Sequence, residues 1–328
     1  MPSSMTHTYF GMDVYQELKS KYQKYISSKQ EYFKLFCQGS DPFMFYHFLL
    51  GIKAKRMKEL QTRMHTEKTQ EFFLTTIHYI HDHHLIHDEE AMACLYGYIC
   101  HYYLDLYTHP FIYYKSGVFD PEDKNTYSYN GIHQEIEYMI DCYLIETREK
   151  ESSQKFRVYE KIFQVSSFSP TLKDLIEESI GITYSIPNVT YKYEKAIWYM
   201  KNFFRYINYD PYGIKLRIYK LIDKISPKKM IRLQELSYYN DYQDKLHYLN
   251  LEHHEWCYPW DNGATFQTSF IDLYNQAKID AIATIQEVTD LLEKEHLEQK
   301  RLKKIFPNLS FTTGKTCQET LKFQYFEF

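Results

Sequence analysis

The chain has 328 residues, of which 44% are hydrophobic and 18% aromatic, and its formal net charge at pH 7 is −4. That length allows one large domain or two ordinary ones, and the acidic balance excludes the basic footprint of a duplex-binding protein. No apolar run approaches the ~20 residues of a membrane-spanning helix, and no signal-peptide pattern opens the chain. Six scattered cysteines without a C-x-x-C pair fit a reducing compartment, so we expect a cytoplasmic protein.

The pattern of the first half is helical. Glycine and proline number only 10 each, and strand-like alternation is rare, which favours an all-α fold. Predicted helices cover 13–36, the stretch from Arg63–Thr69 to His84, 89–109 and 131–150. Pro110 disfavours α geometry at the residue before it, so the third of these helices should end or kink there.

The second half of the chain is also predicted to be mainly helical. Ser-Pro and Asp-Pro pairs mark helix starts, because the side chain caps the helix and proline fits its first turn. Predicted helices cover 170–181, 191–208, 211–225, 228–239 and 267–304. An aromatic loop is expected at 251–260, and short strand-like pieces in the tail. Because no Gly/Ser-rich linker divides the chain, we expect a single all-α domain over 1–328.

One stretch of the third helix stands out for its chemistry. His101, Asp105 and His109 follow each other at intervals of four residues. Each such step drifts by only ~40° around an α-helix, so the three side chains climb one face. Their neighbours are nearly all apolar or aromatic, which indicates a buried helix. Buried imidazoles and carboxylates need partners, and a metal ion would satisfy all three together.

A second pair repeats the same spacing. His133 and Glu137 lie four residues apart on the next predicted helix. Two helices that each present such ligands could close around a binuclear metal cluster. Chance is the alternative for any single pair, since the chain holds 15 His and 43 acidic residues.

Upstream candidates have competing interpretations. Asp41 precedes Pro42, so its carboxylate is either a helix cap or a metal ligand. His65, taken alone, is an ordinary surface histidine. The dense histidines of 78–87 are interleaved with Asp and Glu, which favours a solvated connection over a functional site.

Taken in order, these residues resemble the ligand series of the zinc-dependent phospholipase C family. The matching positions are His7, Asp41, His65, His101, Asp105, His109, His133 and Glu137. The resemblance is best over 1–145. It implies an all-α fold with two or three zinc ions between helices, a metal-binding core over 1–150, a helical C-terminal part over 151–305 and a tail over 306–328.

The resemblance also implies how the ligands divide. One metal would be held by Asp41, His65, His101 and Asp105. A second would be held by His109, His133 and Glu137. Asp105 would bridge toward a third site that uses His7. Iron or manganese also suits such imidazole and carboxylate ligands.

Two departures from the family pattern bear on specificity. Secreted members place a processed N-terminal Trp at the third metal, and this chain has no Trp near His7. The best-known members form a choline pocket with aromatic residues at positions that here are Pro42 and Thr62. Selectivity for a choline head group is therefore not expected.

The implied function is a metal-dependent phosphoric ester hydrolase, in which metal-activated water attacks a phosphodiester. Asp41 would be both ligand and the catalytic group that orients or deprotonates the water. The expected substrate is a phospholipid or another small phosphodiester, met by transient contact with a membrane surface and without a transmembrane segment. Two alternatives stay open: a zinc-dependent single-strand nuclease, whose ligand order is near-identical, and a metal-stabilised helical protein without turnover.

Overall fold

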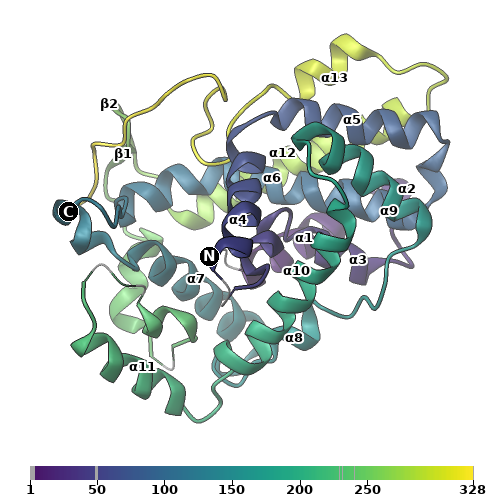
Figure 1. Ribbon diagram of the computed structural model, residues 1–328. Helices are drawn as coiled ribbons and strands as arrows, with labels where there is room; N and C mark the ends of the chain where they lie inside the picture. Colours follow the sequence, from purple (N-terminus) through teal and green to yellow (C-terminus); the bar gives the residue numbers. More distant parts are fainter. Residues whose placement is uncertain (1–3, 49–50, 229, 231, 240, 328) are drawn as a thin grey trace.

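The computed structural model describes residues 4–48, 51–228, 230, 232–239 and 241–327, and it confirms the all-α prediction (Figure 1). The longer helices are α1 (Ser4–Glu17), α4 (Gly51–Thr66), α5 (Thr69–Asp82), α6 (Glu89–Ser116), α7 (Ile132–Glu149), α10 (Val189–Phe203), α11 (Ile214–Ile225) and α12 (Phe270–Leu292). The shorter ones are α2 (Ser20–Gln23), α3 (Gln30–Phe36), α8 (Val158–Lys161), α9 (Pro170–Ile176) and α13 (Gln299–Ile305).

Short 3-10 or π helices link many of these helices. They are η1 (Asp41–Phe45), η2 (Leu85–His87), η3 (Lys124–Tyr129), η4 (Glu177–Ile182), η5 (Phe204–Asn208), η6 (Leu233–Leu236) and η7 (Gln243–Leu249). Two short antiparallel strands, β1 (Trp256–Tyr258) and β2 (Asp261–Phe266), form a hairpin within and after the predicted aromatic loop. None of the described helices is long and apolar enough to cross a membrane.

Helix α6 is the central element of the fold (Figure 1). The Asp88 side chain caps its N-terminus by accepting hydrogen bonds from the amides of Glu90 and Ala91. Most of its side chains are buried, because α1, α3, α7 and α12 all pack against it. A helix covered on several sides is apolar nearly all round, which is what the sequence of α6 shows.

Helix α6 does not end at His109, which was one of the two expected outcomes, because it continues through Pro110 to Ser116. Proline removes the amide that would have bonded the carbonyl of Leu106. The buried side chains of Phe111 and Ile112 hold the next turn in place. Packing of the segment beyond Pro110 thus outweighs the local preference of the residue before proline.

Several other predicted boundaries are wrong for reasons of tertiary structure. The predicted helix 13–36 is three helices, α1 to α3, and its breaks let Tyr22 donate to Asp290 of α12 at 2.9 Å. The predicted helix 267–304 divides into α12 and α13. The predicted tail strands reduce, in the described residues, to a single bridge between Leu309 and Thr316.

The predicted helix 228–239 is also wrong. Its described residues form only η6, and positions 229 and 231 lie outside the described residues. The buried Asp223 carboxylate accepts hydrogen bonds from the amides of Leu233 and Gln234, both at 2.9 Å. A side chain that captures backbone donors in this way competes with helix formation.

Candidate metal centre

Five segments bring the eight predicted ligands to one place. Helix α1 carries His7, η1 carries Asp41, and α4 carries His65 in its last turn. Helix α6 carries His101, Asp105 and His109, and α7 carries His133 and Glu137. Three groups of these side chains could each hold a metal ion: His7 with His101 and Asp105, Asp41 with His65 and His101, and His109 with His133 and Glu137.

The deep group consists of Asp41, His65, His101 and Asp105. His65 Nε2 lies 3.3 Å from His101 Nε2 and 3.1 Å from Asp105 Oδ2. His101 Nε2 lies 3.3 Å from the same Asp105 oxygen, and His65 Nε2 lies 3.6 Å from Asp41 Oδ1. Ligand atoms about 2.0–2.1 Å from a tetrahedral zinc ion are about 3.3 Å apart. The ligand atoms of His65, His101 and Asp105 therefore have nearly the spacing that a tetrahedral zinc ion requires, and the Asp41 oxygen lies slightly further from His65.

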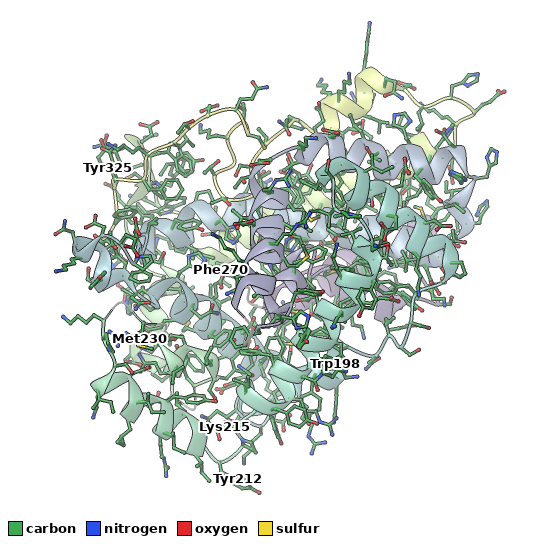
Figure 2. The ribbon with its side chains drawn as sticks, in the orientation of Figure 1. Trp198, Tyr212, Lys215, Met230, Phe270 and Tyr325 are labelled. Carbon is green, nitrogen blue, oxygen red and sulfur yellow. The ribbon has the colours of Figure 1, made fainter. Side chains whose placement is uncertain are left out.

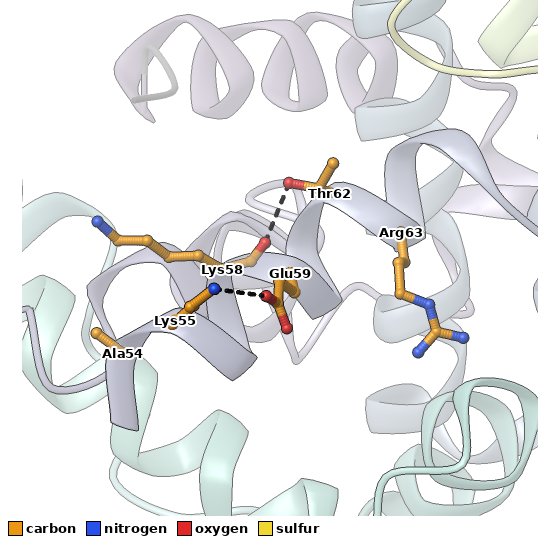
Figure 3. A pocket seen from close by; sticks show the side chains of 6 residues that line it. All are labelled: Ala54, Lys55, Lys58, Glu59, Thr62 and Arg63. Carbon is orange, nitrogen blue, oxygen red and sulfur yellow. Dashed lines mark hydrogen bonds and ion pairs between the residues drawn. The ribbon is translucent and has the colours of Figure 1, made fainter. Parts of the chain in front are cut away.

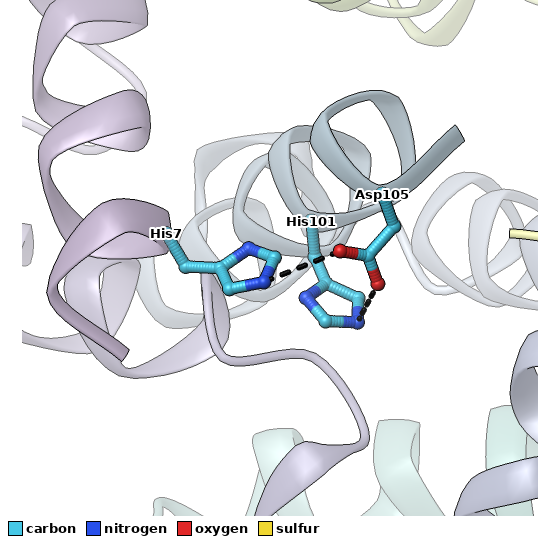
Figure 4. Close-up of side chains that lie close together, drawn as sticks. All are labelled: His7, His101 and Asp105. Atoms are coloured by element: carbon cyan, nitrogen blue, oxygen red, sulfur yellow. Dashed lines mark ion pairs between the residues drawn. The ribbon is translucent and has the colours of Figure 1, made fainter. Parts of the chain in front are cut away.

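Asp105 also faces a second direction. Its Oδ1 lies 3.3 Å from His7 Nε2, and the rings of His7 and His101 are 4.5 Å apart (Figure 4). The same oxygen lies 3.7 Å from His109 Nε2. One carboxylate thus points its two oxygens at separate sets of imidazoles, as a bridging ligand does.

The open group consists of His109, His133 and Glu137. Glu137 Oε1 lies 3.2 Å from His133 Nε2 and 4.0 Å from His109 Nε2. The His133 side chain is 28% exposed, whereas that of His101 is 0% exposed. With three candidate ligands among the described residues and a solvent-facing side, this group would leave room for water or substrate.

Burial and mutual charge govern the ionisation of the centre. Burial acts to raise the pKa of Asp105, but neighbouring imidazoles, above all His109 and His101, hold that pKa well below its usual value. Burial lowers the pKa of His101 well below its usual value. Burial raises the pKa of Asp41 to about 6 against the opposing charge of His65. A deep carboxylate that stays ionised among imidazoles is a good cation ligand.

Unpaired atoms give a second test of metal fit. Among the described residues, buried Asp41 Oδ2 has no hydrogen-bond partner. His7 Nδ1 and His101 Nδ1 have none either, but it is the Nε2 atoms of these two rings that face the centre. Leaving such atoms unpaired costs free energy unless another group compensates. The donor set, the close spacing of the ligand atoms and the unpaired Asp41 Oδ2 fit divalent metal ions.

Sequence reasoning missed the residues that orient the deep group. His65 Nδ1 donates to the carbonyl of Gln61 at 2.9 Å, which leaves Nε2 to face the centre. The Gln61 side-chain amide donates to Asp41 Oδ1 at 3.0 Å. The four-residue spacing from Gln61 to His65 was the available signal. The alternative that Asp41 is a helix cap is wrong, since Ser40 occupies the N-cap position of η1.

A buried carboxylate on α7 anchors the start of α1. Asp141 accepts hydrogen bonds from the Thr6 amide and hydroxyl, both at 2.7 Å, and from the Tyr238 hydroxyl at 2.6 Å. Its position four residues after Glu137 places it one turn further along the same helix. Asp141 thereby fixes His7, the residue after Thr6, against the ligands of α6.

The tail also reaches the centre, which no spacing in the sequence predicted. The Phe311 amide donates to the His65 carbonyl at 2.7 Å, and its ring centroid lies 5.2 Å from that of His65. The Phe311 carbonyl lies 3.3 Å from His109 Nδ1 and can accept its proton. That bond leaves His109 Nε2 free for a metal, so the tail helps to set the ligand atoms of both groups.

Other candidate features lie outside the centre. A pocket of about 540 Å³ on α4 is lined by Ala54, Lys55, Lys58, Glu59, Thr62 and Arg63 (Figure 3). It contains none of the eight ligands. None of the histidines of 78–87 belongs to a metal-competent group of the described residues.

The comparisons with known proteins agree with this geometry. The family model described as zinc dependent phospholipase C matches residues 6–187, which include all eight predicted ligands and more than half of the chain. No curated protein and no solved structure matches the chain. The chain belongs to the zinc-dependent phospholipase C family.

Proposed function

We propose that this protein is a zinc-dependent phosphoric diester hydrolase that cleaves phospholipids as a phospholipase C does. The observation that carries the proposal is the position of Asp105, whose two oxygens face a deep set and an outer set of imidazoles. Such a bridge suits two or three closely spaced cations. Bound divalent cations would neutralise phosphate charge and acidify water, and iron or manganese would do so by the same chemistry.

The protein residues would divide the remaining work. The deep group, closed off from solvent, would fix one cation and the carboxylate that bridges to the next. The open group would hold a second cation on the side where a phosphate can approach, because His133 is partly exposed. The third position, around His7, would share Asp105.

Asp41 is the proposed catalytic group. Its Oδ1 accepts the Gln61 amide, and its Oδ2 is one of the buried atoms without a partner among the described residues. A carboxylate with one oxygen tethered and the other available can orient an attacking water and take its proton. No protein nucleophile is required for that reaction.

The substrate class follows from the family, and head-group selectivity does not. Thr62, which stands at one of the family's aromatic choline positions, donates a hydrogen bond to the Lys58 carbonyl and lines the pocket on α4 (Figure 3). The proposed substrate is therefore a phospholipid without choline preference. Cleavage on the glycerol side of the phosphate would yield diacylglycerol and a phosphorylated head group.

The test uses the full-length, zinc-loaded protein with phosphatidylcholine, an anionic phospholipid and single-stranded DNA as separate substrates. We expect phospholipid turnover that His101→Ala reduces by roughly 10³-fold, since cations contribute several kcal/mol to such transition states. His78→Ala, outside the centre, is the matched control and should not change turnover. Unchanged turnover in His101→Ala would refute the proposal.

Two other outcomes of the same assays would instead favour a single-strand nuclease or a structural metal centre. Faster cleavage of single-stranded DNA than of any phospholipid would favour a nuclease. Full metal loading without turnover of any of the three substrates, together with unfolding on metal removal, would favour a structural metal centre.

A further inference from the structure

Helix α11 presents an apolar face to solvent. Its buried side chains, Leu216 and Asp223, lie on one side of the helix. At 100° per residue, its exposed aliphatic residues fall on the opposite side. They are Ile214 (55% exposed), Ile218 (51%), Leu221 (64%), Ile222 (39%) and Ile225 (86%). A surface helix normally turns such a stripe inward, so this one is reversed.

The helix is held firmly in this orientation. The Asp210 carboxylate accepts hydrogen bonds from the amides of Ile214 and Leu216, at 3.0 and 2.9 Å. At the other end, Asp223 accepts from the amides of Leu233 and Gln234. Both carboxylates are buried. The outward stripe therefore belongs to a docked helix, with both ends tied to the protein.

Positive charge accompanies the stripe. The exposed cationic side chains of α11 and the turn after it are Arg217, Lys220, Lys224 and Lys228. The one acidic residue of the helix, Asp223, points inward. The whole chain has a net charge of −4, so this surface is opposite in sign to the protein that carries it.

The apolar surface continues beyond both ends of the helix. Tyr212, before α11, is 81% exposed, and Met230, after it, is 52% exposed. In Figure 2 Tyr212 lies at the lower rim of the molecule and Met230 higher up, at its left side; Figure 1 shows α11 as an outermost element at the lower left. An aromatic side chain with a polar tip is well suited to the boundary between water and lipid.

We propose that α11 is an interfacial helix that docks the protein on anionic phospholipid membranes. Apolar side chains opposite the protein, with lysine and arginine beside them, are the two features that bind a helix in the plane of a bilayer surface. Cations near such a surface are attracted by its negative potential. The inference deepens the proposed function, and it rests on that function only for the use made of the bound lipid.

The position of α11 links this surface to the open group. The turn after the helix is held by Asn130, whose side-chain amide donates to the carbonyls of Lys228 and Met230 at 2.7 and 2.6 Å. Asn130 lies two residues before the start of α7, three residues before His133. The turn that follows α11 is therefore attached to the segment that leads into His133.

A second copy of the chain is the competing occupant of the stripe. Two copies that met through the same face would bring their Arg217, Lys220 and Lys224 side chains together, which repel. An anionic bilayer instead complements them. The observations thus favour lipid over self-association.

The experiment measures co-sedimentation of the full-length, zinc-loaded protein with vesicles of phosphatidylcholine alone or with 30% phosphatidylserine. We expect binding to the anionic vesicles that weakens as salt rises. Ile218→Asp with Leu221→Asp should reduce binding at least about tenfold, because apolar contacts are replaced by negative charges. Ile279→Asp with Leu251→Asp, both exposed and on other elements, should bind as the wild type does.

A charge-reversal set tests the cations. Arg217→Glu, Lys220→Glu and Lys224→Glu together should weaken binding at least about a hundredfold, at roughly fivefold for each of the three cations lost. Lys300→Glu, Lys303→Glu and Lys304→Glu, the same change on α13, should weaken it much less. Equal loss in both sets, or wild-type binding in the α11 variants, would overturn the inference. Concentration-dependent dimers without vesicle binding would also overturn it, in favour of a second copy.

Hydrolysis of a monomeric short-chain phospholipid separates this inference from the proposed function. We expect α11 variants to keep that activity while they lose vesicle binding. Turnover of the monomeric substrate by a wild-type protein that does not bind vesicles would overturn the interfacial helix alone. Vesicle binding through α11 without any turnover would support the helix and reject the hydrolase.

Discussion

The deep and open groups of the candidate metal centre use the same ligand types in different surroundings. In the deep group, His65, His101 and Asp105 are sealed among helices, with neighbouring ligand atoms 3.1–3.3 Å apart. In the open group, His109 and Glu137 are 4.0 Å apart, and His133 is partly exposed. The ligand atoms of the deep group are thus closely spaced and closed off from solvent. Those of the open group are further apart, and one of its side chains reaches solvent.

That difference separates two tasks of a metal site. A closed set of four protein ligands resembles a structural site, whereas three ligands and an open position resemble a catalytic one. Asp105 connects the two, because each of its oxygens serves a different side. We therefore expect changes in the deep group to affect folding and activity together, and changes in the open group to affect mainly activity.

The largest effect is expected from Asp105→Asn. This change keeps the volume of the side chain but removes the charge that both groups share. We expect loss of metal from both groups, turnover reduced by at least roughly 10³-fold, and a lower thermal midpoint. Metal analysis and calorimetry on the same sample would measure it.

Asp82→Asn, an exposed change on α5, is the control for Asp105→Asn and should leave all three quantities unchanged. Full metal content in Asp105→Asn would show that the two groups do not depend on a shared carboxylate. The comparison between them would then lose its physical basis.

His133→Ala should separate activity from stability. The side chain is partly exposed, so its removal creates little cavity and should change the free energy of unfolding by less than about 1 kcal/mol. Activity should still fall roughly 10²-fold, and about one equivalent of zinc should be lost, because the open group keeps only two ligands. A fall in stability as large as that of Asp105→Asn would contradict the distinction between the groups.

The helices could be predicted where the hydrophobic pattern of the sequence is strongly periodic and no distant contact alters the helix boundary. Helix 131–150 was predicted almost to the residue, as α7, and Ser169 caps α9 as its Ser-Pro pair indicated. Prediction failed where a distant contact decided the outcome. The amides captured by Asp223 and the packing that carries α6 through Pro110 are not visible in a local window of sequence.

The candidate site was predictable to a different extent. Spacing alone placed His101, Asp105 and His109 on one face of a helix, and the structure has them so. The convergence of His7, Asp41 and His65 on that face depended on the family resemblance, because no local pattern links segments so far apart. Phe311, some two hundred residues beyond His109, left no signal at all.

Gly39→Ala probes how closely the deep group is packed. Gly39 has a φ of +52°, and a Cβ added there would lie 2.2 Å from Cδ2 of His101. We expect the His101 ring to shift, turnover to fall about tenfold, and stability to fall by roughly 3 kcal/mol from strain and overpacking. The matched control is Gly263→Ala on exposed β2, where a Cβ meets only the flexible carboxylate of Asp261. Equal effects of the two variants would mean that the deep group tolerates displacement as readily as the surface does.

The smallest effect concerns the region beside the open group. Burial raises the pKa of Glu235 to about 8 from its ordinary 4.5, and the Tyr239 hydroxyl donates to it. Its side chain lies against Gly131, at the start of α7. A carboxylic acid whose pKa is raised by folding contributes most to the stability of the folded state below its unfolded pKa, and that contribution is lost as the pH rises toward 8.

Relative to Glu235→Gln, the wild type should therefore lose about 2 kcal/mol of unfolding free energy between pH 6 and 7.5. Chemical denaturation of both proteins across that range measures the difference, with Glu59→Gln as an exposed control. Parallel curves would show that the surroundings of the open group are no more sensitive to pH than those of the deep group.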